Sequence, residues 1–164
     1  MPEPMTERPA GDAAAADSDA AAGGRTPVPW STLAAVSAGG MLGALARHGL
    51  AEAFPPAPGR FPWTIFWINV AGCLAIGALM ALITEVRPAH PLVRPFLGVG
   101  VLGGFTTFST YVVGIEEAVE GGAARTGLAY LAGTLAAALA AVFAGMTLVR
   151  LAARGARRTG EERP

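Results

Sequence analysis

Residues 98–111 read Gly98-Val-Gly-Val-Leu-Gly-Gly-Phe-Thr-Thr-Phe-Ser-Thr-Tyr111, and this stretch decides the fold. It lies in an apolar segment long enough to cross a bilayer, yet four glycines are followed by four hydroxyl residues that only Phe108 interrupts. Glycine weakens a helix, and unpaired backbone in hydrocarbon is costly unless it faces protein, water or an ion. The stretch therefore predicts a helix break at Gly103 to Thr107, near the middle of a membrane.

The composition is typical of a membrane protein. Of 164 residues, 52% are hydrophobic and 15% are charged, and the mean hydropathy is +0.46,. The formal net charge of zero argues against a nucleic-acid partner,. A single cysteine, Cys73, excludes an intrachain disulfide, and its apolar surroundings predict a packed thiol,.

Four apolar segments follow one another at about 28–50, 61–83, 96–115 and 125–149. Each is close to the ~20 residues that span ~30 Å of hydrocarbon. The fold class predicted is an all-α membrane protein with four transmembrane helices, the third broken at its glycine-rich stretch. We expect residues 1–27 to form a disordered tail, residues 28–152 the transmembrane domain, and residues 153–164 a basic tail.

Arginine placement predicts the orientation of these spans. Four spans put both termini on one side, which carries Arg25, Arg87, Arg94 and the arginines after the fourth segment, against Arg60 and Arg125 opposite. By the positive-inside rule, the termini are expected in the cytoplasm of a bacterial plasma membrane. Four helices form a small core, so a pore or site is expected to need a second copy.

Two polar side chains inside the apolar segments have two interpretations each. A charge such as Arg47 costs about 2.5 to 3.5 kcal/mol at the bilayer centre. It either snorkels to the headgroups beside His48 or attracts anions at a vestibule mouth. Asn69 either joins helices by hydrogen bonds or donates its two N–H bonds to an anion.

Hydroxyl and aromatic residues provide further candidates. Thr126, Tyr130 and Thr134 are spaced by four and share one helix face. Tyr130 and Thr134 either form a polar track of hydroxyl donors, or they have structural roles. In the structural alternative, Tyr130 is an anchor at the membrane interface and the Thr134 hydroxyl bonds a carbonyl of its own helix. Phe108 and Tyr111 are three apart, and aromatic edges carry positive quadrupole charge that suits a small anion. Their position directly after the expected break favours this role over ordinary packing.

The apolar segments contain no carboxylate, no His/Cys metal spacing and no nucleophile beside a base, so the chain is predicted not to be an enzyme. A proton-coupled multidrug or guanidinium exporter would need a membrane-embedded carboxylate. A non-transporting assembly protein, in which Asn69 and the glycines only pack helices, is the other alternative.

Three signatures resemble the CrcB/Fluc fluoride channels over about residues 30 to 150. They are Gly39-Gly-x-x-Gly-Ala-x-x-Arg47, the segment ending Ile68-Asn69, and Gly103-Gly-Phe-Thr-Thr-Phe-Ser-Thr110. The resemblance implies an antiparallel dimer in lipid that exports toxic fluoride passively. It also implies a central Na⁺ ion bound by the backbone carbonyls of Gly103 and Thr106.

The same resemblance assigns the remaining roles. Phe108 matches the first aromatic of the fluoride-lining pair, Asn69 the pore amide and Arg47 the vestibule arginine, and Tyr130 with Thr134 matches the polar track. A fluoride pore must replace water with donors that bind weakly enough to release the ion, and hydroxyls, an amide and aromatic edges suit this task.

Two departures from the family pattern affect pore-lining positions. Tyr111 stands where Phe is usual, and Ile65 stands where Thr is usual, with Thr64 adjacent. Together with the one-sided arginines, they suggest a chain fixed in one orientation that forms a heterodimer with an oppositely inserted homologue. A homodimer of dual topology, which would need near-equal loop charge on both sides, is the alternative.

Overall fold

The computed structural model describes residues 28–57, 60–86 and 89–161, and every regular element in them is helical. The elements are α2 (Trp30–Ala53), α3 (Trp63–Ala81) with its π-helical continuation η1 (Leu82–Val86), the π-helical η2 (Arg94–Leu102), the short α4 (Gly103–Phe105), α5 (Ser109–Glu120) and α6 (Ala124–Glu161). The all-α class is therefore confirmed. The tail expected at residues 1–27 lies outside the described residues.

Three helical stretches of the described chain are long and apolar enough to cross a membrane. They are Trp63–Val86, Arg94–Glu120 and Ala124–Ala156. Helix α2, with 24 residues, is about 36 Å long and could also span, but Arg47, His48 and many small residues lower its hydropathy. A fourth span at α2 thus stays a prediction.

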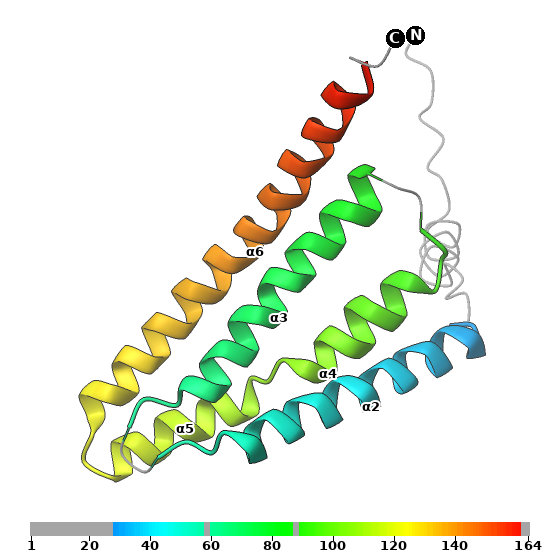
Figure 1. Ribbon diagram of the computed structural model, residues 1–164. Helices are drawn as coiled ribbons and strands as arrows, with labels where there is room; N and C mark the ends of the chain where they lie inside the picture. Colours follow the sequence, from blue (N-terminus) through cyan, green and yellow to red (C-terminus); the bar gives the residue numbers. More distant parts are fainter. Residues whose placement is uncertain (1–27, 58–59, 87–88, 162–164) are drawn as a thin grey trace, which may run out of the picture.

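The helices run up and down in two pairs. Helix α3 packs along α6, while α2 packs along η2 and α4, and α5 packs on the first turns of α6 (Figure 1). Helices α2 and η2 begin, and α3 and α6 end, at the same end of the molecule, at the upper right of Figure 1. The basic segment expected at residues 153–164 continues α6 as far as Glu161.

Glycines allow the closest contacts between helices. A Cβ atom on Gly39 or Gly43 would overlap backbone atoms of η2, and one on Gly77 or Gly145 would overlap the backbone across the α3–α6 pair. Small residues at Gly39 and Gly43 thus let α2 and η2 approach closely,. This approach places α2 directly against the helix that carries the break.

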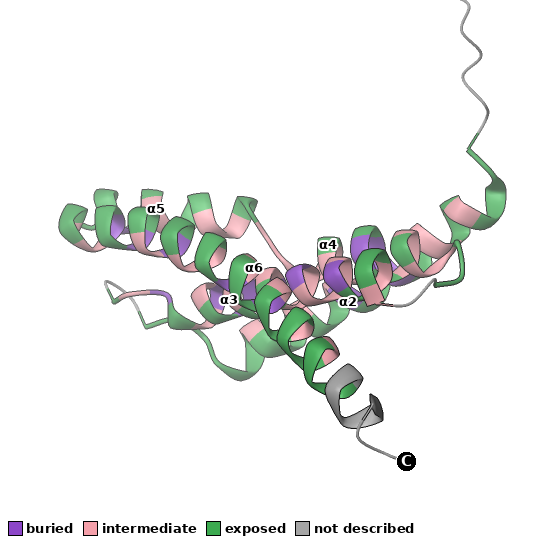
Figure 2. Cartoon of the chain, turned by 90° about the horizontal axis from the view of Figure 1, so that it is seen from above, coloured by how far each residue is buried: buried purple, intermediate pink, exposed green. Residues whose placement is uncertain are grey.

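The buried core is small and aromatic. Ile65, Ile68 and Tyr130 form its buried centre, with rings such as Phe61 and Tyr111 packed around them. Figure 2 shows buried positions between the helices and exposed positions on their outer faces. Large apolar side chains, such as Trp67 at 58% exposure, lie on those outer faces, which suits contact with lipid or a partner subunit.

Candidate ion site and polar path

The spanning stretch Arg94–Glu120 is interrupted at Thr106–Phe108, between α4 and α5. Thr106 is extended, with ψ of 157°, and its N–H and hydroxyl both donate to the carbonyl of Leu102, at 3.0 and 2.9 Å. The predicted break is thus confirmed, but it begins later than Gly103. Gly103 and Gly104 remain helical, because Gly104 packs tightly against the backbone of α2.

Asn69 of α3 holds the interruption from the side. Its Nδ2 donates to the carbonyl of Thr107 at 3.0 Å, and its Oδ1 accepts the Thr107 N–H at 2.9 Å. The side chain is only 8% exposed. These two bonds agree with the interpretation in which Asn69 joins helices. The amide has one further N–H, and the role of Asn69 in a pore stays a prediction.

The interruption changes which backbone carbonyls have donors. In a continuous helix, the N–H groups of residues 107 and 110 would bond the carbonyls of Gly103 and Thr106. Here Thr107 N–H donates to Asn69, and Thr110 N–H donates to the Thr107 hydroxyl at 3.2 Å. The carbonyls of Gly103 and Thr106 lose their helical donors. Carbonyls freed at a broken helix are sodium ligands in membrane proteins, so this donor set fits the predicted ion.

Arg47 lies at the same interruption. Its Nε donates to the carbonyl of Gly104 at 3.2 Å, and the side chain is partly buried. This bond across the helix pair disfavours the interpretation in which Arg47 snorkels to the headgroups. A role for its charge toward an anion stays a prediction.

Tyr130 and Thr134 are buried donors of the α3–α6 side. Tyr130 is 0% exposed and Thr134 is 5% exposed, and neither hydroxyl bonds any atom of the described residues. Tyr130 is therefore not an interface anchor. Three other threonines, Thr84, Thr106 and Thr147, donate to the carbonyl four residues earlier, whereas Thr134 does not, so the self-bonded alternative also fails.

The two aromatic residues of the predicted fluoride path face different surroundings. Phe108 is 77% exposed, with its ring centroid 5.9 Å from that of Tyr111. Tyr111 meets Tyr130 edge-on, with centroids 5.1 Å apart, and its hydroxyl donates to the carbonyl of Leu131 at 2.7 Å. The structure thus brings Tyr111 and Tyr130 together, while Phe108 faces outward and Arg47 lies on the α2 side of the break.

Thr107 is a central residue of the break, although the sequence pattern did not single it out. Its backbone carries both bonds to Asn69, and its hydroxyl accepts the N–H of Thr110 and lies 3.1 Å from the Thr110 hydroxyl. A side chain that accepts the N–H three residues on is the usual start of a helix. The Thr107-Phe-Ser-Thr110 spacing was therefore an available signal for where α5 begins.

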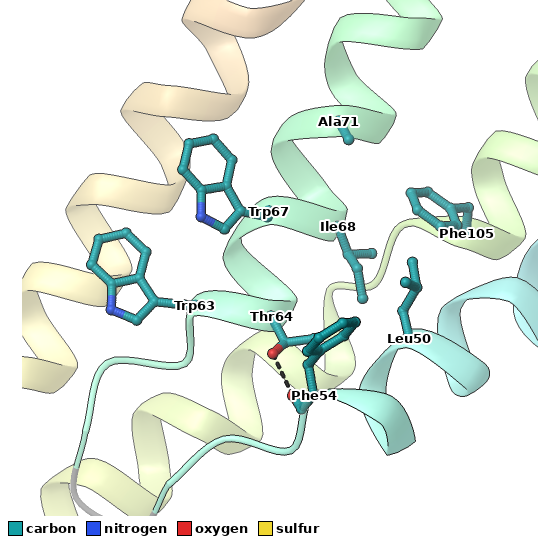
Figure 3. A pocket seen from close by; sticks show the side chains of 8 residues that line it. All are labelled: Leu50, Phe54, Trp63, Thr64, Trp67, Ile68, Ala71 and Phe105. Atoms are coloured by element: carbon teal, nitrogen blue, oxygen red, sulfur yellow. Dashed lines mark hydrogen bonds between the residues drawn. The ribbon is translucent and has the colours of Figure 1, made fainter.

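An apolar groove of about 440 Å³ opens between α2, α3 and the break (Figure 3). It is lined by Leu50, Phe54, Trp63, Thr64, Trp67, Ile68, Ala71 and Phe105. The Thr64 hydroxyl donates to the carbonyl of Phe54 (Figure 3), while Ile65 is buried in the core. Thr64 therefore does not take over the position of Ile65, and the polar groups in the groove lining are its engaged hydroxyl and the two indole N–H groups,.

Comparison with known proteins decides the family. Residues 34–146 match the family model described as CrcB-like protein, Camphor Resistance (CrcB). The chain belongs to the CrcB family. The resemblance drawn from the three sequence signatures is thereby confirmed.

The CrcB relatives of this chain are named as fluoride channels. It is 53% identical over 143 residues to fluoride-specific ion channel FluC 1 of Streptomyces coelicolor, covering 87% of this chain and 90% of the relative. It is 52% identical over 132 residues to FluC 2 of Nocardia farcinica, covering 80% and 94%. CrcB proteins are ion channels, so the prediction that the chain is not an enzyme is confirmed.

Proposed function

We propose that this chain is a fluoride-selective channel that lets fluoride leave the cytoplasm passively and so reduces its toxicity. The observation that carries the proposal is the interruption at Thr106–Phe108 with its freed carbonyls. The names of the CrcB relatives support fluoride as the ion. The chain supplies donors and aromatic edges for a small anion, and the apolar segments at 28–50, 61–83, 96–115 and 125–149 contain no carboxylate.

A sodium ion and a second subunit complete the proposed channel. The carbonyls of Gly103 and Thr106 would hold the ion, which supplies a fixed positive charge to the pore when bound. Gly103 is exposed, and a Cβ built on it would come no closer than 4.0 Å to the nearest atom, the carbonyl oxygen of Gly98. Because bare carbonyls do not face lipid, we infer that an oppositely oriented subunit covers this surface and contributes the same pair of carbonyls.

The proposed fluoride path follows Tyr130, Thr134, Asn69 and the aromatic edges of Phe108 and Tyr111. The two unpaired hydroxyls support it, because a buried donor without a protein acceptor is normally satisfied by a ligand or water. The exposed ring of Phe108 would line the path together with the partner subunit. Hydroxyl and ring-edge donors bind an anion without a fixed charge, which favours release as well as entry.

The arginines favour a fixed orientation and a heterodimer with an oppositely inserted homologue. Helix η2 begins, and α3 and α6 end, at one end of the molecule (Figure 1), and Arg94 starts η2 while Arg150 and Arg154 belong to the last part of α6. Arg150 also pairs with Glu85 of η1, with 2.7 Å between Nη2 and Oε1. In this orientation both termini would be cytoplasmic.

Fluoride efflux tests the proposed function directly. The complex is isolated through a tag on this chain, so that any homologous partner is retained, and placed in liposomes loaded with potassium fluoride or potassium chloride, with the same sodium concentration on both sides of the membrane. We expect fluoride release after valinomycin provides a potassium path, and no chloride release. Fluoride release without valinomycin would indicate proton coupling, and silence from the whole complex would support a packing role instead.

A further inference from the structure

Arg47 lies on the face of α2 that contacts the broken helix. Gly40, Gly43 and Arg47 are spaced by three and four residues, so they lie on one face of α2. A Cβ on Gly43 would overlap the backbone at Val101, and one on Gly104 would overlap the backbone of Gly40. Because the two backbones touch along this face, the side chain one turn further on reaches a carbonyl of the facing helix.

The carbonyls around the break divide into two classes. Leu102, Gly104 and Thr107 have carbonyls that accept from Thr106, Arg47 and Asn69, respectively. The carbonyls of Gly103 and Thr106 have no such partner, because the N–H groups of Thr107 and Thr110, which would bond them in a continuous helix, donate to side chains instead. Each of these two bare carbonyls is therefore followed in sequence by a carbonyl that a side chain from another helix holds.

The charge and the planar geometry of the Arg47 guanidinium group suit a position at the carbonyl end of a helix. Gly104 lies in the last turn before the break, where unpaired carbonyls give a helix end partial negative charge that a cation stabilises. A hydrogen bond from a charged donor is stronger than one from a neutral donor. The Nε–H is fixed in the plane of the group, so it sets the direction of the carbonyl more firmly than a lysine ammonium can.

We propose that Arg47 is a positioning residue: its Nε–H clamps the carbonyl end of the broken helix against α2 and thereby aims the carbonyls of Gly103 and Thr106 at the ion. The identity of that ion as sodium rests on the proposed function. Asn69 clamps the other side of the break through Thr107. Arg47 is not a ligand of the ion in this proposal but holds the backbone that carries the ligands.

Hydrogen–deuterium exchange of the peptide covering residues 103–110 tests the clamp without any ion flux. In Arg47→Met, we expect the Thr106 and Thr107 amides to exchange about tenfold faster, as losing a hydrogen bond to a charged group implies, while amides of α3 and α6 keep their wild-type rates. Arg125→Met is the matched control, because it removes one exposed arginine, which is the second residue of α6. Equal exchange in Arg47→Met and wild type would overturn the proposal.

The sodium dependence of fluoride efflux supplies the second measurement. We expect the half-activating sodium concentration to rise about tenfold in Arg47→Met, less in Arg47→Lys, and not at all in Arg125→Met, with chloride excluded throughout. If Arg47→Met fails to fold, Arg47→Lys tests the proposal in its place. Wild-type amide exchange and wild-type sodium dependence in Arg47→Lys would show that the positive charge alone matters, and would refute the clamp. Wild-type vesicles that release no fluoride would refute the proposed function, while the exchange comparison would still decide on Arg47.

Discussion

At the residue scale, Asn69 combines a structural and a proposed transport role. Its amide carbonyl and one N–H bond the backbone of Thr107, which leaves one N–H for an anion. A sequence pattern shows an amide in an apolar helix but not its partners, because these depend on where another helix breaks. The prediction of Asn69 as an important residue could therefore be made from sequence, but its clamp on Thr107 could not.

Asn69→Asp should abolish fluoride passage. The carboxylate would still accept the Thr107 N–H, but it would place a negative charge in the path and lose the donor to the Thr107 carbonyl. An unpaired buried charge costs several kcal/mol, so we expect efflux to fall by about a hundredfold or more. Fluoride-electrode recordings on liposomes check this, and efflux at the wild-type rate would remove Asn69 from the path.

Thr134→Val tests whether the unpaired hydroxyl serves transport. The hydroxyl is buried without an acceptor in the described residues, so its removal should not lower the thermal unfolding temperature in detergent. Loss of one donor to fluoride should slow efflux about tenfold, as one hydrogen bond implies.

Thr147→Val is the matched control for that substitution, because Thr147 lies on the same helix but donates to the carbonyl of Phe143 at 2.7 Å. Its fluoride efflux should stay at the wild-type rate. Equal efflux from Thr134→Val and Thr147→Val would argue against the polar track. Sequence could not predict that the Thr134 hydroxyl makes no bond to the carbonyl four residues earlier, because Thr84, Thr106 and Thr147 all make that bond.

At the element scale, the sequence predicted the helices well and their ends less well. The apolar segments at 61–83 and 125–149 correspond to Trp63–Val86 and to the membrane part of α6. Hydropathy marks where lipid contact ends, whereas the Ala- and Arg-rich residues that follow are good helix formers, so α6 continues to Glu161. The break begins after its glycines, because Gly104 is needed for close packing and Asn69 fixes Thr107.

Gly43→Ala should disrupt the α2–η2 pair. The added Cβ would overlap the backbone of η2, which no side-chain rearrangement relieves. Overpacking of this kind costs about 1 to 3 kcal/mol, so the unfolding temperature and fluoride efflux should both fall. Gly49→Ala is the control on the same helix, since a Cβ there would meet no atom within 4 Å, and it should match or exceed wild-type stability. Equal stability of the two variants would contradict the proposed packing.

At the scale of the whole molecule, the arginine distribution predicts a single orientation. The end where α3 and α6 finish carries more arginine than the end with Arg60 and Arg125. Reporter tags on each terminus, expressed with and without a homologous partner, should therefore be accessible only from the cytoplasm. Comparable amounts on both faces would support a dual-topology homodimer and refute the fixed orientation.

The central claim is that the helix interruption exposes the carbonyls of Gly103 and Thr106 so that a sodium ion can complete a fluoride channel. Its most direct test is fluoride efflux from vesicles that contain the tagged complex, with sodium replaced on both sides by a large organic cation. We predict that fluoride release falls as sodium is removed and returns when sodium is restored, with chloride excluded throughout. Fluoride release that is independent of sodium would contradict the claim.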